Sequence, residues 1–166
     1  HDDMAANLSA IAPMVRQAAG EGAEWVLLPE NAFHMQAPAS PQGAAMEEGA
    51  HTGVQAARHW AQECKVWLLV GSVQVASGAQ ALPVNRSLLI APTGEITARY
   101  DKIHLFDVEL PGGEIYRESS KCAPGNQAVV AQMNGIKNGQ EAMLGLSICY
   151  DVRFPHLYRA LAKTGA

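Results

Sequence analysis

A strongly apolar stretch from Val66 to Val75 does more than any other segment to limit the folds open to this chain. The stretch is far shorter than the roughly 20 apolar residues that a membrane-spanning helix needs, and it is typical of a buried strand. Shorter apolar stretches at 24–28, 87–91, 96–100, 128–133 and 142–148 predict further strands. The chain is therefore expected to form a sheet with its central strands in the core.

Helices are predicted between these strands by apolar residues at helical spacing. The first follows Asp3, which can cap its start, and places Leu8 and Val15 on one face. A second covers residues 54–64, and a third begins at Pro155. Helices and strands alternate early, and hairpin signals follow. This order favours a mixed sheet covered by helices, in the α/β class.

The domain organisation is predicted to be simple. We find no internal repeat, no low-complexity segment and no linker, so residues 1–166 are read as a single domain. Loops are expected at 31–50 and 101–127. The first helix lacks the strand that would precede it in a layered fold, and the chain stops after the last helix. We therefore expect a partial domain in which the first strand and the C-terminal strands are missing.

Composition excludes several classes of function. The formal net charge is −4 and no basic cluster stands out, so nucleic acid is not an expected partner. No membrane segment or signal peptide is visible. The three cysteines are odd in number and widely spaced, which favours a reducing compartment such as the cytoplasm over a disulfide framework. The six histidines lack metal-ligand spacing, so no metal is expected.

Cys149 is the first candidate for chemistry. It ends the apolar strand 144–148 and precedes a turn. In open α/β sheets, ligands bind beyond the carboxyl ends of strands, and the backbone N–H of Tyr150 in that turn can stabilise an anion. The alternative is a buried structural cysteine. Cys64 lies on the apolar face of a predicted helix and Cys122 in a loop, so neither is a candidate nucleophile.

Glu30 and Lys102 also follow apolar strands. Taken singly, each is read as an ordinary polar residue at a strand end. Together with Cys149 they make chemical sense, because a thiol with a pKa of about 8.5 is a weak nucleophile without help. Glu30 would take the thiol proton, and Lys102 with the Tyr150 N–H would hold the oxyanion.

Three segments of the sequence resemble the signature segments of the nitrilase superfamily, in the family's order and spacing. They are Leu28–Asn31, Tyr100–Asp107 and Ser147–Pro155. The resemblance covers essentially the whole chain. It implies an αββα sandwich, a Glu-Lys-Cys triad at Glu30, Lys102 and Cys149, and a homo-oligomer. It implies no cofactor.

The resemblance also implies further site residues. Glu118 would position the base or the substrate; without the resemblance it reads as a surface acid. The segment 104–113 and Arg153 resemble the branch that contains omega-amidase and deaminated glutathione amidase. In that branch Arg153 would clamp a substrate carboxylate; the alternative is a structural pair with Asp151 or another acid. Asn31 and Phe154, in the same motifs, are expected to contact substrate.

The expected activity is that of a thiol-dependent amidase. Its substrate would be a small carboxylate-bearing amide, hydrolysed with water through a Cys149 thioester and with release of ammonia. Alternatives are a nitrilase or a carbamoyl-amide hydrolase of the same superfamily. A non-catalytic binding protein that keeps the fold is a third reading.

Overall fold

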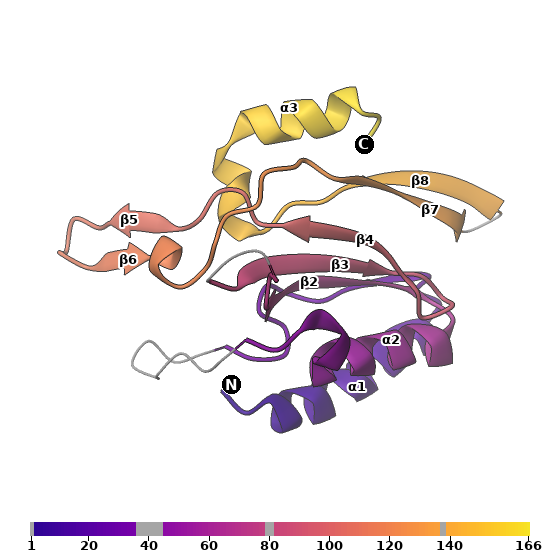
Figure 1. Ribbon diagram of the computed structural model, residues 1–166. Helices are drawn as coiled ribbons and strands as arrows, with labels where there is room; N and C mark the ends of the chain where they lie inside the picture. Colours follow the sequence, from indigo (N-terminus) through magenta and orange to yellow (C-terminus); the bar gives the residue numbers. More distant parts are fainter. Residues whose placement is uncertain (1, 36–44, 79–81, 137–138) are drawn as a thin grey trace.

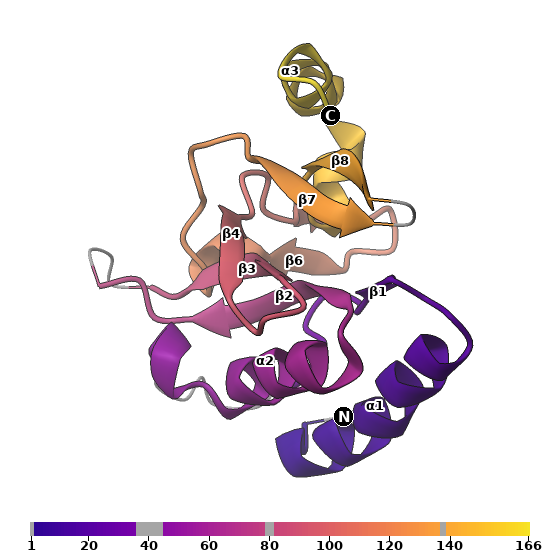
Figure 2. The same ribbon diagram turned by 90° about the vertical axis from the view of Figure 1, so that its right-hand side faces the viewer.

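The computed structural model describes residues 2–35, 45–78, 82–136 and 139–166, which form four layers (Figures 1 and 2). Two helices cover one face of a four-stranded sheet, a two-stranded sheet packs on the other face, and a third helix covers the outside. The helices are α1 (Met4–Gly20), α2 (Thr52–Cys64) and α3 (Pro155–Lys163). The αββα arrangement inferred from the resemblance is confirmed.

The larger sheet has the strand order β1-β2-β3-β4. Its strands are β1 (Trp25–Leu27), β2 (Trp67–Val75), β3 (Val84–Ile90) and β4 (Ile96–Asp101). Strand β1 runs parallel to β2, and the other neighbours are antiparallel, so the mixed sheet is also confirmed. With these directions, β1, β2 and β4 end at the edge of the sheet where β3 begins.

The smaller sheet consists of β7 (Val130–Ile136) and β8 (Gln140–Gly145), paired antiparallel. Trp67 and Leu89 of the larger sheet pack against Ala131 and Met133 of β7, which closes the sandwich. The Trp67 indole N–H also donates to the Asn134 carbonyl at 3.1 Å. The described residues thus hold the two sheets together through an apolar layer and the hydrogen bond between Trp67 and Asn134.

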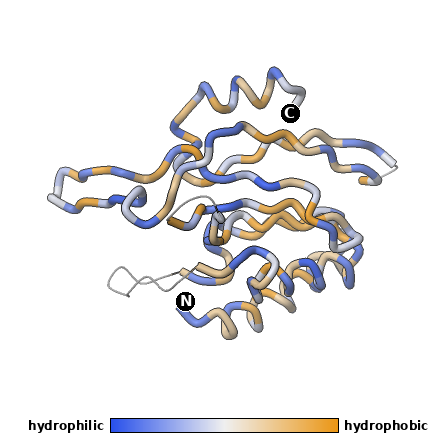
Figure 3. Tube along the Cα trace, in the orientation of Figure 1, coloured by the Kyte–Doolittle hydropathy of each residue, from blue (hydrophilic) through white to orange (hydrophobic). Residues whose placement is uncertain are grey.

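Apolar residues follow the strands in Figure 3, as the sequence predicts. Val15 of α1 and Val54 of α2 pack with Leu68 and Val70 of β2 in the largest buried cluster. Each such side chain contributes about 1.5–3 kcal/mol when fully buried. On the far side, Leu157 and Leu161 of α3 pack with Tyr100, Leu146 and Ile148. No described helix is long and apolar enough to cross a membrane.

Three details differ from the sequence expectation. The strand at 24–28 is not buried, because β1 pairs only with β2 among the described strands, and Leu27 is 56% exposed. The loop expected at 31–50 contains the 3-10 helix η1 (Glu48–Ala50), while residues 36–44 lie outside the described part of the chain.

The stretch 101–127 is also more ordered than expected. It holds a hairpin of β5 (Asp107–Glu109) and β6 (Ile115–Arg117), followed by the 3-10 helix η2 (Glu118–Ser120). Strands of three residues with largely exposed side chains leave no periodic pattern in a sequence, so the hairpin escaped detection.

Candidate active site

The three residues predicted to form the triad lie around one cleft at the shared edge of the larger sheet. Glu30 follows β1, Lys102 follows β4, and Cys149 begins the 3-10 helix η4 (Cys149–Arg153) after β8. The cleft has a volume of about 280 Å³, and Glu118 of η2 also lines it. Four segments far apart in the sequence therefore contribute to one site.

Lys102 forms the centre of an ionic cluster. Its side chain is 2% exposed, and Nζ lies 3.0 Å from Oε1 of Glu30 and 2.9 Å from Oε2 of Glu118. Burial alone would lower the pKa of Lys102, but the hydrogen bonds and charges of Glu118 and Glu30 outweigh it and raise the pKa. Lys102 is therefore held in its charged form between two carboxylates.

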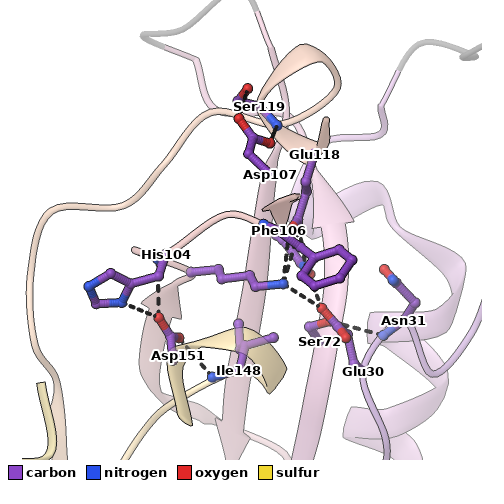
Figure 4. Close-up of polar contacts among 12 residues, drawn as sticks. Glu30, Asn31, Ser72, His104, Phe106, Asp107, Glu118, Ser119, Ile148 and Asp151 are labelled. Atoms are coloured by element: carbon purple, nitrogen blue, oxygen red, sulfur yellow. Dashed lines mark hydrogen bonds and ion pairs between the residues drawn. The ribbon is translucent and has the colours of Figure 1, made fainter. Parts of the chain in front are cut away.

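Glu118 is fixed by more than this ion pair. Its Oε2 accepts a 2.7 Å hydrogen bond from the backbone N–H of Phe106, so the carboxylate spans the loop between β4 and β5 (Figure 4). The hydroxyl and the backbone N–H of the next residue, Ser119, both bond the Asp107 carboxylate. These contacts fasten η2 to the start of the hairpin and hold Glu118 beside Lys102.

Asn85 joins the two carboxylates and was missed by the sequence analysis. Its Nδ2 donates to Oε1 of Glu30 at 3.0 Å and to Oε1 of Glu118 at 3.3 Å. The one signal in the sequence is a polar residue beside the apolar strand 87–91, and that strand in fact begins earlier, at Val84. A polar residue at a strand end does not by itself identify a site residue, because its burial and its partners are visible only in the structure.

A close backbone crossing places Glu30. At Gly71 in β2, a Cβ atom would collide with the backbone of Leu28 and Pro29. The next residue, Ser72, accepts a 2.9 Å hydrogen bond from the Asn31 N–H through Oγ. Asn31 has φ of +50°, in the left-handed region that asparagine tolerates better than most residues. The chain thus turns sharply after β1 and directs Glu30 toward Lys102.

Cys149 is the exposed thiol of the site. Its pKa is raised by partial burial and by the hydrogen bond and negative charge of Glu30, with Lys102 acting in the opposite direction. A thiol with a raised pKa and a carboxyl group beside it is the arrangement on which general-base activation can act. Its φ of +44° lies in the left-handed region, which is strained for a residue with a Cβ.

A buried aspartate anchors the turn that carries Cys149. Asp151 is 0% exposed and accepts hydrogen bonds from the Tyr100 hydroxyl at 2.7 Å and from the Ile148 N–H at 2.9 Å. Its other oxygen contacts the backbone N–H and the ring Nδ1 of His104 (Figure 4). Burial and the Asp151 carboxylate raise the pKa of Tyr100, so the phenol stays protonated and donates.

The other predicted site residues are placed less centrally. Arg153 is exposed at the end of η4 and is not among the residues that line the cleft; no hydrogen bond or ion pair joins it to Asp151 in the described chain. Phe154 stacks on His104 with ring centroids 3.7 Å apart and contacts the Tyr150 ring edge-on. Asn31 lines the cleft, and its Oδ1 is buried without a partner in the described residues.

Cys122, which was expected in a loop and not as the nucleophile, also lines the cleft. It is buried, and burial together with the Glu118 charge raises the pKa of its thiol to about 11. A thiol with so high a pKa is a poor nucleophile at neutral pH. Among the described residues no cluster of three or more His, Cys, Asp or Glu side chains is arranged to hold a metal.

Comparison with known proteins gives concordant matches. The family model described as carbon-nitrogen hydrolase matches residues 2–166. A deaminated glutathione amidase of Synechocystis sp. (strain PCC 6803 / GT-S) is 37% identical over 96% of this chain and 57% of its own length. The omega-amidase NIT2 of Homo sapiens is 32% identical over 96% of this chain and 54% of its own length. The chain thus spans about half the length of these relatives.

Solved structures agree on the fold. An amidase of Nesterenkonia AN1 from the nitrilase superfamily superposes with a TM-score of 0.78 at 26% identity, over 99% of this chain and 57% of that one. The C. elegans NitFhit protein superposes with a TM-score of 0.76 at 29% identity, over 100% of this chain and 39% of that one. With its sequence motifs, layers and family match in agreement, the chain belongs to the carbon-nitrogen hydrolase family.

Proposed function

We propose that the protein is a thiol-dependent amidase that hydrolyses the C–N bond of a small carboxylate-bearing amide. The observation that carries the proposal is the buried Lys102 held between Glu30 and Glu118, with the exposed Cys149 thiol in the same cleft. A base, a fixed cation and a nucleophile within one cleft are the parts that acyl transfer needs.

In the first half of the reaction, the Cys149 sulfur attacks the amide carbon while Glu30 takes the thiol proton. A base is required because the pKa of Cys149 is raised and the thiol carries its proton at neutral pH. The carbonyl oxygen becomes an oxyanion held by Lys102 Nζ and the Tyr150 backbone N–H. When the C–N bond breaks, Glu30 returns its proton to nitrogen, and ammonia leaves a Cys149 thioester behind.

In the second half, Glu30 takes a proton from water, and the resulting hydroxide attacks the thioester carbon. The C–S bond breaks, the thiol regains its proton from Glu30, and the carboxylic acid is released. Glu118 would keep Lys102 oriented in both halves. No cofactor enters the scheme, since every proton and electron pair is supplied by these residues, the amide and water.

The preference for a carboxylate-bearing substrate is supported by cationic side chains around the cleft. Arg117 and Lys121 line it together with Lys102, and a cleft of about 280 Å³ suits a small molecule. Arg153, the residue inferred from the resemblance, stays a prediction as the carboxylate clamp. Replacing Arg117 or Arg153 by Gln would show which arginine binds the substrate carboxylate. Loss of that arginine raises KM for the charged amide and leaves KM for a neutral amide unchanged.

The relatives support the same chemistry. Two of them are named for amidase activity on deaminated glutathione and on omega-amides. In a further structure of the Nesterenkonia amidase, 26% identical with a TM-score of 0.78 over 99% of this chain and 59% of that one, acrylamide has added to the active-site cysteine. We propose the same nucleophilic role for Cys149.

The deciding experiment uses the whole protein, with Cys149→Ala beside wild type. It measures ammonia release from alpha-ketoglutaramate and cysteinylglycine release from deaminated glutathione, because the amide nitrogen of the second substrate belongs to that dipeptide. Cys64→Ala serves as the matched control, because Cys64 lies on α2 and outside the cleft. We expect turnover by wild type and by Cys64→Ala, and none by Cys149→Ala.

Other outcomes would redirect the assignment. A folded wild type that is inactive on both amides would remove that substrate class, and nitriles and carbamoyl compounds would be tested next. A chain inactive on all of them would favour a non-catalytic binding protein. We also propose that the whole protein is a homo-oligomer, which a measurement of its molecular mass in solution tests. We propose a cytoplasmic location as well, which cell fractionation tests.

A further inference from the structure

Asn85 contacts every charged member of the ionic cluster. The residue is 1% exposed, and its Nδ2 donates to Glu30 at 3.0 Å and to Glu118 at 3.3 Å. Its backbone carbonyl accepts a 2.9 Å hydrogen bond from the N–H of Lys102. One residue of β3 thus touches both carboxylates through its side chain and the backbone of Lys102 through its main chain.

The orientation of the amide is fixed by its surroundings. Ionised carboxylates only accept hydrogen bonds, so the nitrogen end of Asn85, with its two hydrogens, must face Glu30 and Glu118. The oxygen end, Oδ1, is turned away, is buried, and has no hydrogen-bond partner among the described residues. An unpaired buried acceptor costs stability, so a purely structural role would favour an apolar side chain at this position.

The charge balance of the site explains what the amide contributes. Glu30 and Glu118 share one ammonium group, so the cluster carries an excess negative charge. Like charges held close together favour protonation of one of them, whereas N–H donors favour the ionised form. The other titratable and charged groups that line the cleft with the two carboxylates are Lys102, Tyr116, Arg117, Lys121, Cys122 and Cys149.

We propose that Asn85 is a positioning residue that holds Glu30 and Glu118 apart on either side of Lys102 and keeps both carboxylates ionised. The inference rests on the proposed function in one respect, namely that Glu30 is the base for the Cys149 thiol. Asn85 does not touch the reacting atoms. It acts through the two carboxylates, so its effect is a change in the pH range over which the base works.

The test uses Asn85→Leu, Asn85→Asp and Asn85→Ser in the whole protein. Leu keeps the approximate volume without donors, Asp exchanges the donors for a third negative charge, and Ser keeps a single donor. Asn134→Asp is the matched control, since it adds the same charge at an exposed position of β7. Folding of each variant is checked by circular dichroism and thermal unfolding.

Two readouts are followed against pH: ammonia release, and alkylation of Cys149 by iodoacetamide measured by mass spectrometry. We expect the low-pH inflection of both profiles to move up by about one pH unit in the Leu and Asp variants. On the acid side of the inflection, turnover should fall by about tenfold in the Leu and Asp variants and by less in Ser, because a shift of one pH unit lowers the ionised fraction of the base tenfold at most. Asn134→Asp should match wild type.

The proposal would be overturned if folded Asn85→Leu or Asn85→Asp had the pH profiles of wild type. It would also be overturned if turnover fell without any shift of the inflection. The alkylation profile needs no substrate. If wild type releases no ammonia but the alkylation inflection still moves, the substrate assignment fails and the role of Asn85 stands. If Leu and Asp fail to fold, the Ser variant with its single donor decides.

Discussion

Two ionic clusters lie side by side on strands β3 and β4, and they are built on opposite principles. Asn85 and Lys102 serve the cluster in the cleft, whereas their chain neighbours Arg86 and Asp101 belong to the other. Arg86 bonds Asp101 through two nitrogens, at 2.6 and 2.9 Å, and Glu48 at 3.1 Å. Arg99 bonds the same Glu48 at 2.8 Å. Successive strand residues point to opposite faces, so one pair of strands supplies both clusters.

The difference lies in the balance of charge. The cluster around Arg86 sets two guanidinium groups against two carboxylates, and every charge has an opposite partner. The cluster around Lys102 has two carboxylates for one ammonium, and its cation is almost fully buried. A balanced cluster contributes mainly to stability. A carboxylate in excess over the cations, lying beside a thiol, can in addition accept a proton. Matched substitutions in the two clusters test this distinction.

The largest effect is expected for Lys102→Met. Turnover should fall by about a hundredfold to a thousandfold, since a fixed cation at the oxyanion is lost. Stability should fall by up to about 3 kcal/mol, because two neighbouring carboxylates are left without their cation. Steady-state kinetics and urea unfolding measure the two losses. Turnover within threefold of wild type would remove Lys102 from the site chemistry.

Glu30→Gln removes both the proton acceptor and its negative charge, and two measurements report on these losses separately. Turnover falls by about a hundredfold or more without a proton acceptor. At the same time the pKa of Cys149 falls, because the negative charge that raises it is gone and the opposing charge of Lys102 remains. Alkylation of Cys149 against pH should therefore shift to lower pH. The exposed Glu141→Gln serves as the control, and an unchanged thiol profile in Glu30→Gln would show that Glu30 does not act on Cys149.

Arg86→Met is the counterpart of Lys102→Met in the balanced cluster. The ion pairs with Asp101 and Glu48 are partly buried, so their loss should cost about 1–2 kcal/mol of unfolding free energy. Turnover measured on the folded variant should change less than about threefold, since no described contact links Arg86 to the cleft residues. A loss of turnover as large as that of Lys102→Met would erase the distinction between the clusters.

The smallest effect is expected in the acid range. Burial alone would raise the pKa of Glu48, but hydrogen bonds and charges of Arg99 and Arg86 lower it overall. A carboxyl group with a lowered pKa in the folded state stabilises the fold above its unfolded pKa of about 4.3, and this is lost as pH falls through the folded value. The midpoint of urea unfolding, measured between pH 6 and 3, should fall less steeply in Arg86→Met than in wild type. Equal slopes would contradict a lowered pKa of Glu48 caused by Arg86.

Much of the fold could be predicted because it follows from local patterns. The apolar stretch Val66–Val75 becomes the central strand β2, and the capped amphipathic segment after Asp3 becomes α1. The order of helices and strands was enough for the mixed sheet. The β5–β6 hairpin was not predicted because its short exposed strands have no pattern of their own; Glu118 and Ser119 hold its start through contacts with Phe106 and Asp107.

The candidate site was predictable only where residues stand in motifs. The meeting of Glu30, Lys102, Glu118 and Cys149 around one cleft agrees with the motif reading, while their catalytic roles stay predictions. Asn85 was missed because its partners are 55 and 33 residues away in sequence. Gly71 was missed for a related reason: its role depends on the backbone that crosses it, which no local pattern records.

The backbone at Cys149 has a consequence for how this position changes over evolution. With φ of +44°, the residue adopts a conformation that glycine enters freely and that costs an L-residue about 1 kcal/mol or more. Drift toward greater thermal robustness would therefore favour glycine there, and only selection for a reactive sulfur opposes it. At residue 149, stability favours glycine and reactivity favours cysteine. A lineage that no longer needs the thiol can therefore gain stability by one substitution.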